Sequence, residues 1–264
     1  MKLGFIGLGN MASAIIGGIL KKGLVAPEDI LGSDKFSGAM EKAAEQFGIK
    51  TTEQNTDVAS QADVLFLAVK PQFLEGVLVE IAPCLSENTL IISMAAGKSL
   101  GWLYEKLNVN VRLIRIMPNT AAFVGESCTA ICKGKYALAE DVTVAETLCG
   151  AFGTTQVIDE SMMDVFSALG GSSGAFVFLY MEALADGAVA AGMPRQMAYQ
   201  VAAQSTLGAA KLMAETKEHP GVLKDMVCSP GGTTIEGIKA LEKAGVRAGV
   251  IDAVEACVNK AKKL

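Results

Sequence analysis

Short apolar runs alternate with amphipathic stretches over the first 158 residues of the chain. Mainly apolar runs predict buried strands at Leu3–Leu8, Ile30–Ser33, Val64–Val69, Thr89–Met94 and Val111–Ile116, with less distinct ones near Thr129–Cys132 and Thr155–Ile158. The stretches between them predict helices over Asn10–Lys22, Ser37–Phe47, Phe73–Ile81 and Ser99–Leu107. Mainly apolar strands that alternate with helices are typical of an α/β domain whose parallel sheet is covered on both faces.

The pattern changes after Ile158, where only helical periodicity remains. Helices are predicted over Asp164–Leu169, Gly174–Ala191, Pro194–Glu215, Thr234–Ala244 and Arg247–Lys262. We therefore expect two domains, residues 1–158 and residues 159–264. Between Val165 and Thr216 only five of 52 residues are charged, which is too few for helices with a free outer face. We expect a second copy of the chain to cover this apolar surface, giving a homo-oligomer built from dimers.

Composition excludes several classes of partner. The net charge is −5 at pH 7, and the one basic cluster, residues 260–263, is expected to be a solvated helix end, so no nucleic-acid surface is predicted. Six scattered cysteines without a CxxC pair and a single histidine give no zinc motif, and no metal site is expected. Unpaired cysteines packed as small apolar side chains fit a reduced, cytoplasmic compartment.

No targeting or membrane segment is predicted. The N-terminal apolar run resembles a signal peptide, but Gly7, Gly9 and Asn10 interrupt it and favour a strand, a turn and a helix. The longest apolar stretch, residues 174–193, contains Glu182 and Asp186, which argues against a span across a lipid bilayer.

A glycine-rich loop follows the first predicted strand. Gly7, Leu8, Gly9, Asn10, Met11 and Ala12 match the pattern G-x-G-x-x-A, and the second predicted strand leads to Asp34, 22 residues after Ala12. Gly7 permits the tight turn, Gly9 lets the backbone approach a pyrophosphate, and Ala12 keeps the helix close to the strand. The sequence therefore predicts a dinucleotide-binding site at this loop.

The residues after the second strand bear on the choice of dinucleotide. A carboxylate such as Asp34 favours the free ribose 2′-hydroxyl of NAD, although Asp34 fits a solvated turn equally well. Ser33 and Lys35 offer a hydroxyl and a cation to a 2′-phosphate, and they lead us to expect NADP, with NADPH preferred over NADH. Asn55 precedes another predicted helix, either as a plain N-cap or as a residue facing the adenosine.

Five segments together identify a family. They are GFIGLGNMA at 4–12, AVKP at 68–71, SMAAG at 93–97, MPNT at 117–120 and EHPGVLKDMVCSPGGTTIEG at 218–237. Over essentially its whole length the chain resembles the pyrroline-5-carboxylate reductases. The resemblance implies an N-terminal Rossmann dinucleotide-binding domain and a C-terminal all-helical dimerisation domain. It also implies the reduction of Δ1-pyrroline-5-carboxylate to L-proline, usually with NADPH, as the last step of proline biosynthesis.

The same resemblance implies roles for particular residues. The cofactor would be lined by the loop at 7–12 and by Ser33, Asn55, Ala68, Val69, Lys70, Pro71, Met94, Ala95 and Ala96. The substrate would be held by Gly231, Gly232, Thr233 and Thr234, with Glu160 near it. The chain departs from the family's usual pattern in the segment Gly170–Phe176, where Gly174 stands in place of a proline and Phe176 in place of a tyrosine, so the resemblance does not define substrate affinity or ring-size preference, but it still implies the reaction class.

The loop before the predicted helix at 234–244 explains how a small carboxylate is bound. Gly231 and Gly232 leave backbone N–H groups uncovered at a positive helix end, and Ser229 and Thr233 add hydroxyls. We expect Thr234 to orient the ring nitrogen as the catalytic residue, with the proton drawn from solvent. In the alternative interpretation the loop only lets two helices pack.

His219 is expected to be structural, because Pro220 beside it indicates a helix boundary. Two other functions remain open. A related imine or β-hydroxyacid reductase would need a lysine or an aspartate on the long helix at 174–191, which offers only Glu182 and Asp186. A non-catalytic NADP-sensing protein would have no need of the complete SPGGTT segment.

Overall fold

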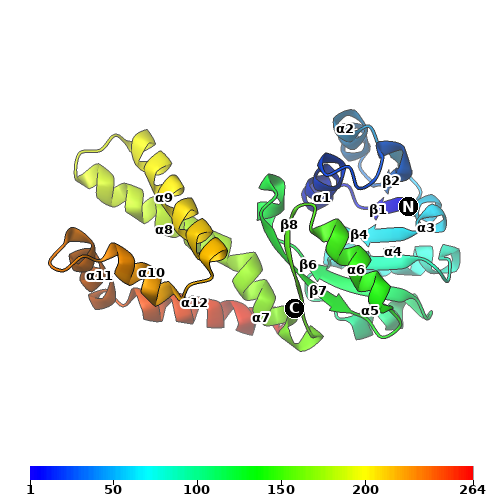
Figure 1. Cartoon of the computed structure of the whole chain (residues 1–264). Helices are drawn as coiled ribbons and strands as arrows, with labels where there is room; N and C mark the ends of the chain where they lie inside the picture. Colours follow the sequence, from blue (N-terminus) through cyan, green and yellow to red (C-terminus); the bar gives the residue numbers. More distant parts are fainter. Residues whose placement is uncertain (264) are drawn as a thin grey trace. The chain divides into compact units, whose positions relative to one another are not determined.

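The computed structural model describes residues 1–263, and its contacts divide the chain into two compact units (Figure 1). The first unit, called the sheet unit below, contains residues 1–171 and the residues from Val258 onward. The second, called the helical unit, contains Ser172–Cys257. The division by contacts thus falls later in the chain than the expected domain boundary at residue 158, and the C-terminal end returns to the sheet unit.

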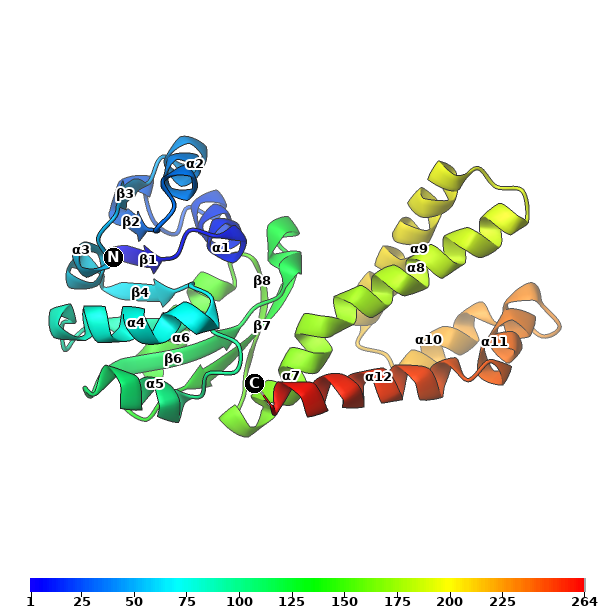
Figure 2. The same ribbon diagram turned by 180° about the vertical axis from the view of Figure 1, so that it is seen from behind.

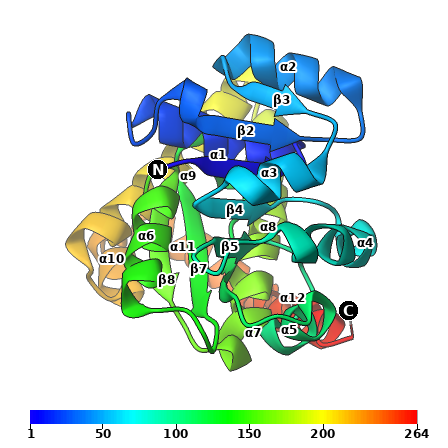
Figure 3. The ribbon, with the colours of Figure 1, turned by 90° about the vertical axis from the view of Figure 1, so that its right-hand side faces the viewer.

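The sheet unit is built on eight strands in the order β3-β2-β1-β4-β5-β6-β7-β8 (Figure 3). The strands are β1 (Leu3–Ile6), β2 (Ile30–Ser33), β3 (Lys50–Thr52), β4 (Val64–Leu67), β5 (Leu90–Ser93), β6 (Arg112–Met117), β7 (Ser127–Lys133) and β8 (Gly153–Val157). The short β3 was not predicted, because Lys50–Thr52 is polar and lies at the edge of the sheet.

The predicted all-parallel sheet is wrong at one pair of strands. β6 and β7 are antiparallel, whereas the other neighbouring strands run parallel. β6 ends at Met117 and β7 begins at Ser127, and only a short 3₁₀ helix over Thr120–Val124 lies between them. This connection is too short for the crossover that two parallel strands require, so the chain turns back on itself.

Helices cover both faces of the sheet, as predicted (Figure 3). The helices of this unit are α1 (Asn10–Lys21), α2 (Ser37–Phe47), α3 (Asn55–Gln61), α4 (Pro71–Ile81), α5 (Leu100–Leu107), α6 (Ala139–Cys149) and α7 (Met163–Phe166). Side chains of α1, α2 and α6 share one apolar core, and those of α3, α4 and α5 share the other. In the first core the rings of Phe5 and Phe66, from neighbouring strands, stack with centroids 4.7 Å apart.

The helical unit is composed of α-helices (Figure 2). They are α8 (Ser173–Ala190), α9 (Arg195–Thr216), α10 (Pro220–Val227), α11 (Thr233–Lys243) and α12 (Val246–Ala261), whose last residues belong to the sheet unit. A π-helical stretch over Ser167–Ser172 leads into α8. Gly174 and Phe176, which depart from the family, therefore lie in the first turn of a continuous helix.

This unit buries almost no large apolar side chain. Within Ser172–Cys257 the buried hydrophobic residues are three alanines, Ala185, Ala198 and Ala202. Phe178 and Leu179 on α8 are 68% and 67% exposed, and Leu207 on α9 is 57% exposed. Burial of apolar surface is the main stabilising contribution in a domain, so these helices need apolar surface from elsewhere to cover them.

In the part of the chain that the structure describes, one helical stretch, Glu160–Ala190, is long and apolar enough to cross a membrane by length and composition. Asp164, Glu182 and Asp186 interrupt it, and carboxylates are costly inside a bilayer. From Ser172 onward its exposed apolar residues, such as Phe178 and Leu179, belong to the uncovered surface of the helical unit.

Candidate cofactor and substrate sites

The glycine loop lies at the carboxyl end of β1, at the point where the strand order reverses. β1 pairs with β2 on one side and with β4 on the other, and ligands of open α/β sheets bind at such a switch point. Gly7 has φ +95°, and a Cβ there would lie 2.7 Å from the carbonyl oxygen of Ala68. A Cβ on Gly9 would meet nothing within 4 Å, so the space beside this residue is open for a ligand.

The carboxyl end of β2 holds this loop in place. The Gly7 N–H donates to the Ser33 carbonyl oxygen at 2.8 Å, and the Leu8 N–H donates to Asp34 Oδ2 at 2.8 Å. The other carboxylate oxygen of Asp34 accepts from the Phe36 N–H at 3.0 Å. Asp34 is therefore no solvated turn residue, and that alternative interpretation is wrong.

The first turn of α1 presents free backbone donors. Its first intrahelical bond runs from the Ser13 N–H to the Gly9 carbonyl at 3.0 Å, so the N–H groups of Asn10, Met11 and Ala12 have no partner within the helix. Together with the positive helix end, these groups form a place for an anion such as a pyrophosphate.

Two further strand ends lie beside the loop. Ala68 follows β4 and its N–H donates to the Ile6 carbonyl at 2.8 Å, while Met94 follows β5 and its N–H donates to the Leu67 carbonyl at 3.3 Å. The structure thus brings the segments 68–71 and 94–96 together with the loop at 7–12, along the adjacent parallel strands β1, β4 and β5.

Ser33 and Asn55 are also neighbours, but in a different way from that expected. Ser33 is fully buried, and its Oγ donates to Asn55 Oδ1 at 2.8 Å. Asn55 Nδ2 donates in turn to Glu80 Oε2 on α4, also at 2.8 Å. Asn55 is the first residue of α3 and Gln54 is the N-cap, so the prediction of an Asn55 cap is wrong. Lys35, in contrast, is exposed.

Gly7 provides a direct test of this geometry. We expect Gly7→Ala to lower the free energy of unfolding by about 1–3 kcal/mol, because the left-handed φ strains alanine and its Cβ meets the Ala68 carbonyl. The KM for the cofactor should rise as well. Thermal unfolding and cofactor titration measure both quantities. Gly38→Ala, in α2 where a Cβ meets nothing within 4 Å, is the control: it should leave the KM for the cofactor unchanged and should not lower the free energy of unfolding, because alanine is favoured over glycine in a helix.

The predicted substrate loop lies in the helical unit, between α10 and α11. Gly231 has φ +68°, and the Gly232 N–H donates to the Ser229 carbonyl at 3.0 Å. The left-handed φ of Gly231 favours glycine there, and a Cβ on Gly232 would lie 2.4 Å from Ser229 Oγ, so the Ser229 side chain would have to move. Gly232 is the N-cap of α11, which begins at Thr233. The N–H groups of this first turn therefore point out of the helix, as an anion site needs.

Glu160 lies in the sheet unit, where its Oε1 has two partners. It accepts from the Leu100 N–H at 2.7 Å, at the start of α5, and from Arg115 Nη1 at 3.1 Å. Arg115 is buried in β6, with a side chain 5% exposed. Arg115 was not predicted, although the two arginines within the otherwise apolar segment 111–116 were a signal for buried ion pairs. Whether Glu160 also contacts the substrate stays a prediction.

The remaining candidate groups have structural roles. Burial raises the pKa of the Cys132 thiol to about 11, with a further contribution from the Glu160 carboxylate, so this thiol stays protonated at neutral pH. The expected structural role of His219 is confirmed, because it is the N-cap of α10 and its Nδ1 accepts from the Gly221 N–H at 3.1 Å. No cluster of three metal-ligating side chains occurs within residues 1–263.

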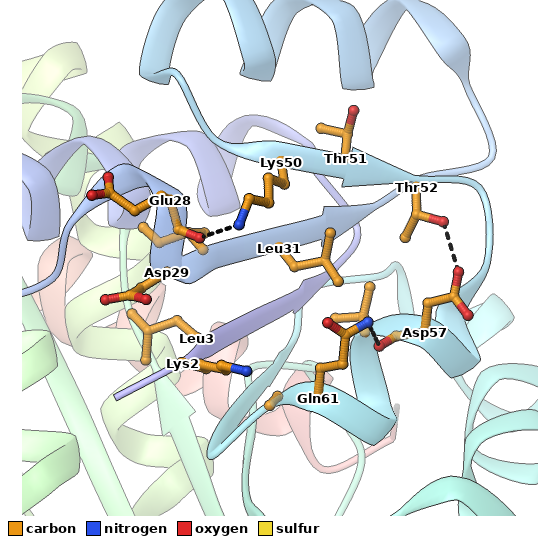
Figure 4. Close-up of a pocket in the computed structure, with 13 residues that line it drawn as sticks. Lys2, Leu3, Glu28, Asp29, Leu31, Lys50, Thr51, Thr52, Asp57 and Gln61 are labelled. Atoms are coloured by element: carbon orange, nitrogen blue, oxygen red, sulfur yellow. Dashed lines mark hydrogen bonds between the residues drawn. The ribbon is translucent and has the colours of Figure 1, made fainter.

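A hollow of about 390 Å³ lies at the opposite end of the strands (Figure 4). Asp29, just before β2, and Lys50, the first residue of β3, both line it. Lys50 Nζ donates to the Glu28 carbonyl at 2.9 Å. Because ligands of parallel sheets bind at the carboxyl ends of the strands, this hollow at the amino ends is not the dinucleotide site.

Comparison with known proteins assigns the chain to a family. Residues 160–264 match the family model for pyrroline-5-carboxylate reductase dimerisation, and residues 2–97 match the model described as NADP oxidoreductase coenzyme F420-dependent. The chain is 44% identical over 263 residues to the pyrroline-5-carboxylate reductase of Escherichia coli, covering 100% of this chain and 98% of that protein. This chain belongs to the pyrroline-5-carboxylate reductase family. The reductase of Glycine max is 42% identical over 262 residues, covering 99% of this chain and 95% of the plant protein.

Solved structures of the family agree with the fold. A pyrroline-5-carboxylate reductase from Coxiella burnetii matches with a TM-score of 0.94 and 34% identity, covering 99% of this chain and 97% of the other. A Plasmodium falciparum pyrroline carboxylate reductase, solved with NADP bound, matches with a TM-score of 0.88 and 30% identity, over 100% of this chain and 97% of the other. The chain is thus an NAD(P)H-dependent oxidoreductase with a dinucleotide-binding domain and a helical dimerisation domain, as predicted.

Proposed function

We propose that this chain reduces Δ1-pyrroline-5-carboxylate to L-proline with NADPH as the preferred cofactor, as a cytoplasmic homodimer or a multiple of dimers. The observation that carries the proposal is the presence in one chain of two helices that begin after a glycine N-cap without a side-chain capping bond, at residues 7–12 and 231–234. A pyrophosphate fits the first and a small carboxylate fits the second. The family's activity supports the assignment of these two ligands.

The residues of the chain contribute position and polarity. Bound NAD(P)H would supply the hydride that adds to the carbon of the substrate's C=N bond. The backbone N–H groups after Gly232 hold the carboxylate, and the Thr234 hydroxyl orients the ring nitrogen. Solvent delivers the proton, because His219 is engaged as a helix cap. Holding the reacting atoms in one geometry is the main contribution that the protein makes to this type of reaction.

A single assay tests the proposal. We expect the purified chain to oxidise NADPH when Δ1-pyrroline-5-carboxylate is added and to produce proline in equal amount. If cofactor binds but no oxidation follows, the non-catalytic alternative is supported instead. If a β-hydroxyacid or another imine is the better substrate by kcat/KM, the assignment to pyrroline-5-carboxylate is wrong.

Lys35 is the residue that we propose for the 2′-phosphate of NADPH. It is exposed at the carboxyl end of β2. An exposed ion pair contributes up to about 1 kcal/mol, so Lys35→Ala should lower the ratio of kcat/KM for NADPH to that for NADH by about fivefold. Ser33→Ala should leave this ratio unchanged, because the Ser33 hydroxyl is buried and donates to Asn55. An unchanged ratio in Lys35→Ala would remove Lys35 from the cofactor site.

A further inference from the structure

The segment MPNT at 117–120 helped to identify the family, but the proposed reaction gives it no role. Its Asn119 is half-buried and lies two residues after the end of β6. β6 runs parallel to β5, and β5 runs parallel to β4, so Asn119 lies at the same edge of the sheet as the cofactor segments 68–71 and 94–96. The 3₁₀ helix that begins after Asn119 also lies beside α1, the helix of the glycine loop.

Both ends of the Asn119 side-chain amide are used by backbone groups. Its Oδ1 accepts from the Ala121 N–H at 3.1 Å, which makes Asn119 the N-cap of the 3₁₀ helix. Its Nδ2 donates to the Gly170 carbonyl at 2.7 Å, across 51 residues of the chain. A backbone N–H can only donate and a carbonyl can only accept, so these two partners fix the orientation of the amide.

Gly170 belongs to the π-helical turn Ser167–Ser172, which directly precedes α8. Such turns are rare and frequently occur at functional sites. A Cβ on Gly170 would lie 3.1 Å from the ring of Phe166, so the backbone is closely packed here. The turn is one of the two covalent connections between the sheet unit and the helical unit, the other being in α12. Asn119 therefore ties this connection to the edge of the sheet that carries the cofactor loop.

The connection matters because the two predicted ligand sites lie in different units. The loop at 7–12 belongs to the sheet unit and the loop at 229–234 to the helical unit. Hydride transfer needs the reacting atoms about 3–3.5 Å apart and aligned, and a displacement of about 1 Å can lower the rate about 100-fold. This holds whether the two ligands meet within one chain or between two copies, because every helical unit is attached through this turn.

We infer that Asn119 is a positioning residue for hydride transfer, which holds the π-helical turn before α8 in the conformation that the reaction requires. The inference rests on the proposed function, because it concerns the rate of that reaction. Asn119 acts through the Gly170 carbonyl, so it is the hydrogen bond to Gly170, and not the helix cap at Ala121, that the reaction depends on.

Two replacements test this bond separately from the cap. Asn119→Asp and Asn119→Ser both keep an oxygen that can accept from the Ala121 N–H, and aspartate and serine are favoured N-cap residues. The aspartate variant places a carboxylate oxygen where the donor was, and the serine side chain is too short to reach the Gly170 carbonyl. We expect both variants to fold and the rate constant of hydride transfer to fall by about 10- to 100-fold.

The rate constant is measured in a single turnover, with enzyme and Δ1-pyrroline-5-carboxylate in excess over NADPH. Measured in this way it does not depend on the fraction of folded protein, so a loss of stability alone would not change it. Hydrogen–deuterium exchange of the backbone amides at 167–173 should be faster in both variants, because the turn loses its tie to the sheet unit. The Kd for NADPH should change less than the rate constant, since the loop at 7–12 keeps its own hydrogen bonds.

Asn110→Asp is the matched control. Asn110 is exposed and lies two residues before β6, so the same chemical change is made at the opposite end of the same strand. It should alter neither the rate constant nor the exchange at 167–173.

Three results would overturn the inference. Wild-type rate constants in both Asn119 variants would limit Asn119 to the helix cap, and a lower rate constant in the aspartate variant alone would assign the effect to the introduced charge. A lower rate constant with wild-type exchange at 167–173 would mean that Asn119 acts at another place. An inactive wild type would instead refute the proposed reaction, and the exchange measurement would still decide whether Asn119 holds the turn.

Discussion

Replacing Leu207 with glutamate is expected to abolish the dimer. Leu207 lies on α9 and is 57% exposed in the isolated chain, within a unit whose buried hydrophobic residues are three alanines. If a second copy covers this surface, burial of the leucine stabilises the dimer by about 1.5–3 kcal/mol per subunit. Burying an unpaired carboxylate there would destabilise the dimer by more than the loss of this leucine contact alone. Sedimentation velocity at micromolar concentration should show monomer or aggregate for the variant and a dimer or larger for the wild type.

Val79→Glu is the matched control for this experiment. Val79 lies on α4 in the sheet unit and is 61% exposed, so the same change of an exposed apolar residue is made outside the dimerisation region. It should leave the assembly intact. A monomeric wild type would contradict the prediction, and so would a variant of Leu207 that sediments as the wild type does.

Removing the Thr234 hydroxyl is expected to damage turnover more than cofactor binding. Loss of one preorganised polar contact in an active site lowers the rate by up to about 10²–10³-fold, and an imine develops less negative charge than an oxyanion. We therefore expect Thr234→Ala to lower kcat/KM for pyrroline-5-carboxylate by about 10- to 100-fold. The Kd for NADPH should remain unchanged, because the glycine loop at 7–12 belongs to the sheet unit.

The structure also defines what Thr234→Ala should do to stability. Gly232 is the N-cap of α11 and no side-chain capping bond is made there, so Thr234 is not the cap that a purely structural role would require. The melting temperature should therefore change little. Thr234→Ser, which keeps the hydroxyl, should restore most of the activity. A destabilised Thr234→Ala protein with normal kcat/KM would leave this residue with a structural role only.

Much of the fold could be predicted because its elements are encoded locally. The strands at 3–6 and 64–67 are apolar along their whole length and the strand at 90–93 is apolar up to Ser93, and the structure places all three in the buried sheet. The elements that were missed carry weaker local patterns. β3 is the polar segment Lys50–Thr52, α6 mixes polar and apolar residues with little helical periodicity, and α10 is only eight residues long and begins at Pro220.

In the candidate sites, too, the local features could be predicted from the sequence and the long-range contacts could not. The loop at 7–12 and the loop at 229–234 are recognisable in the sequence because glycine is needed at fixed places in each, and Gly7 and Gly231 do adopt positive φ. The partners of these loops were not predictable. Whether Asp34 faces solvent or the glycine loop depends on a hydrogen bond to Leu8 across 26 residues, and no periodic pattern reports such a bond.

The sequence by itself determined the family, the order of strands and helices along the chain, and the two glycine-rich helix starts, because each depends on residues within a few positions of one another. Tertiary structure alone decided that β7 runs antiparallel to β6, that Glu80 orients Asn55 and Ser33, and that Arg115 pairs with Glu160. The three side-chain hydrogen bonds join residues 22 to 45 positions apart in the chain. They are fixed by which side chains a buried sheet brings within hydrogen-bonding distance, and a buried polar group must find a partner among those neighbours.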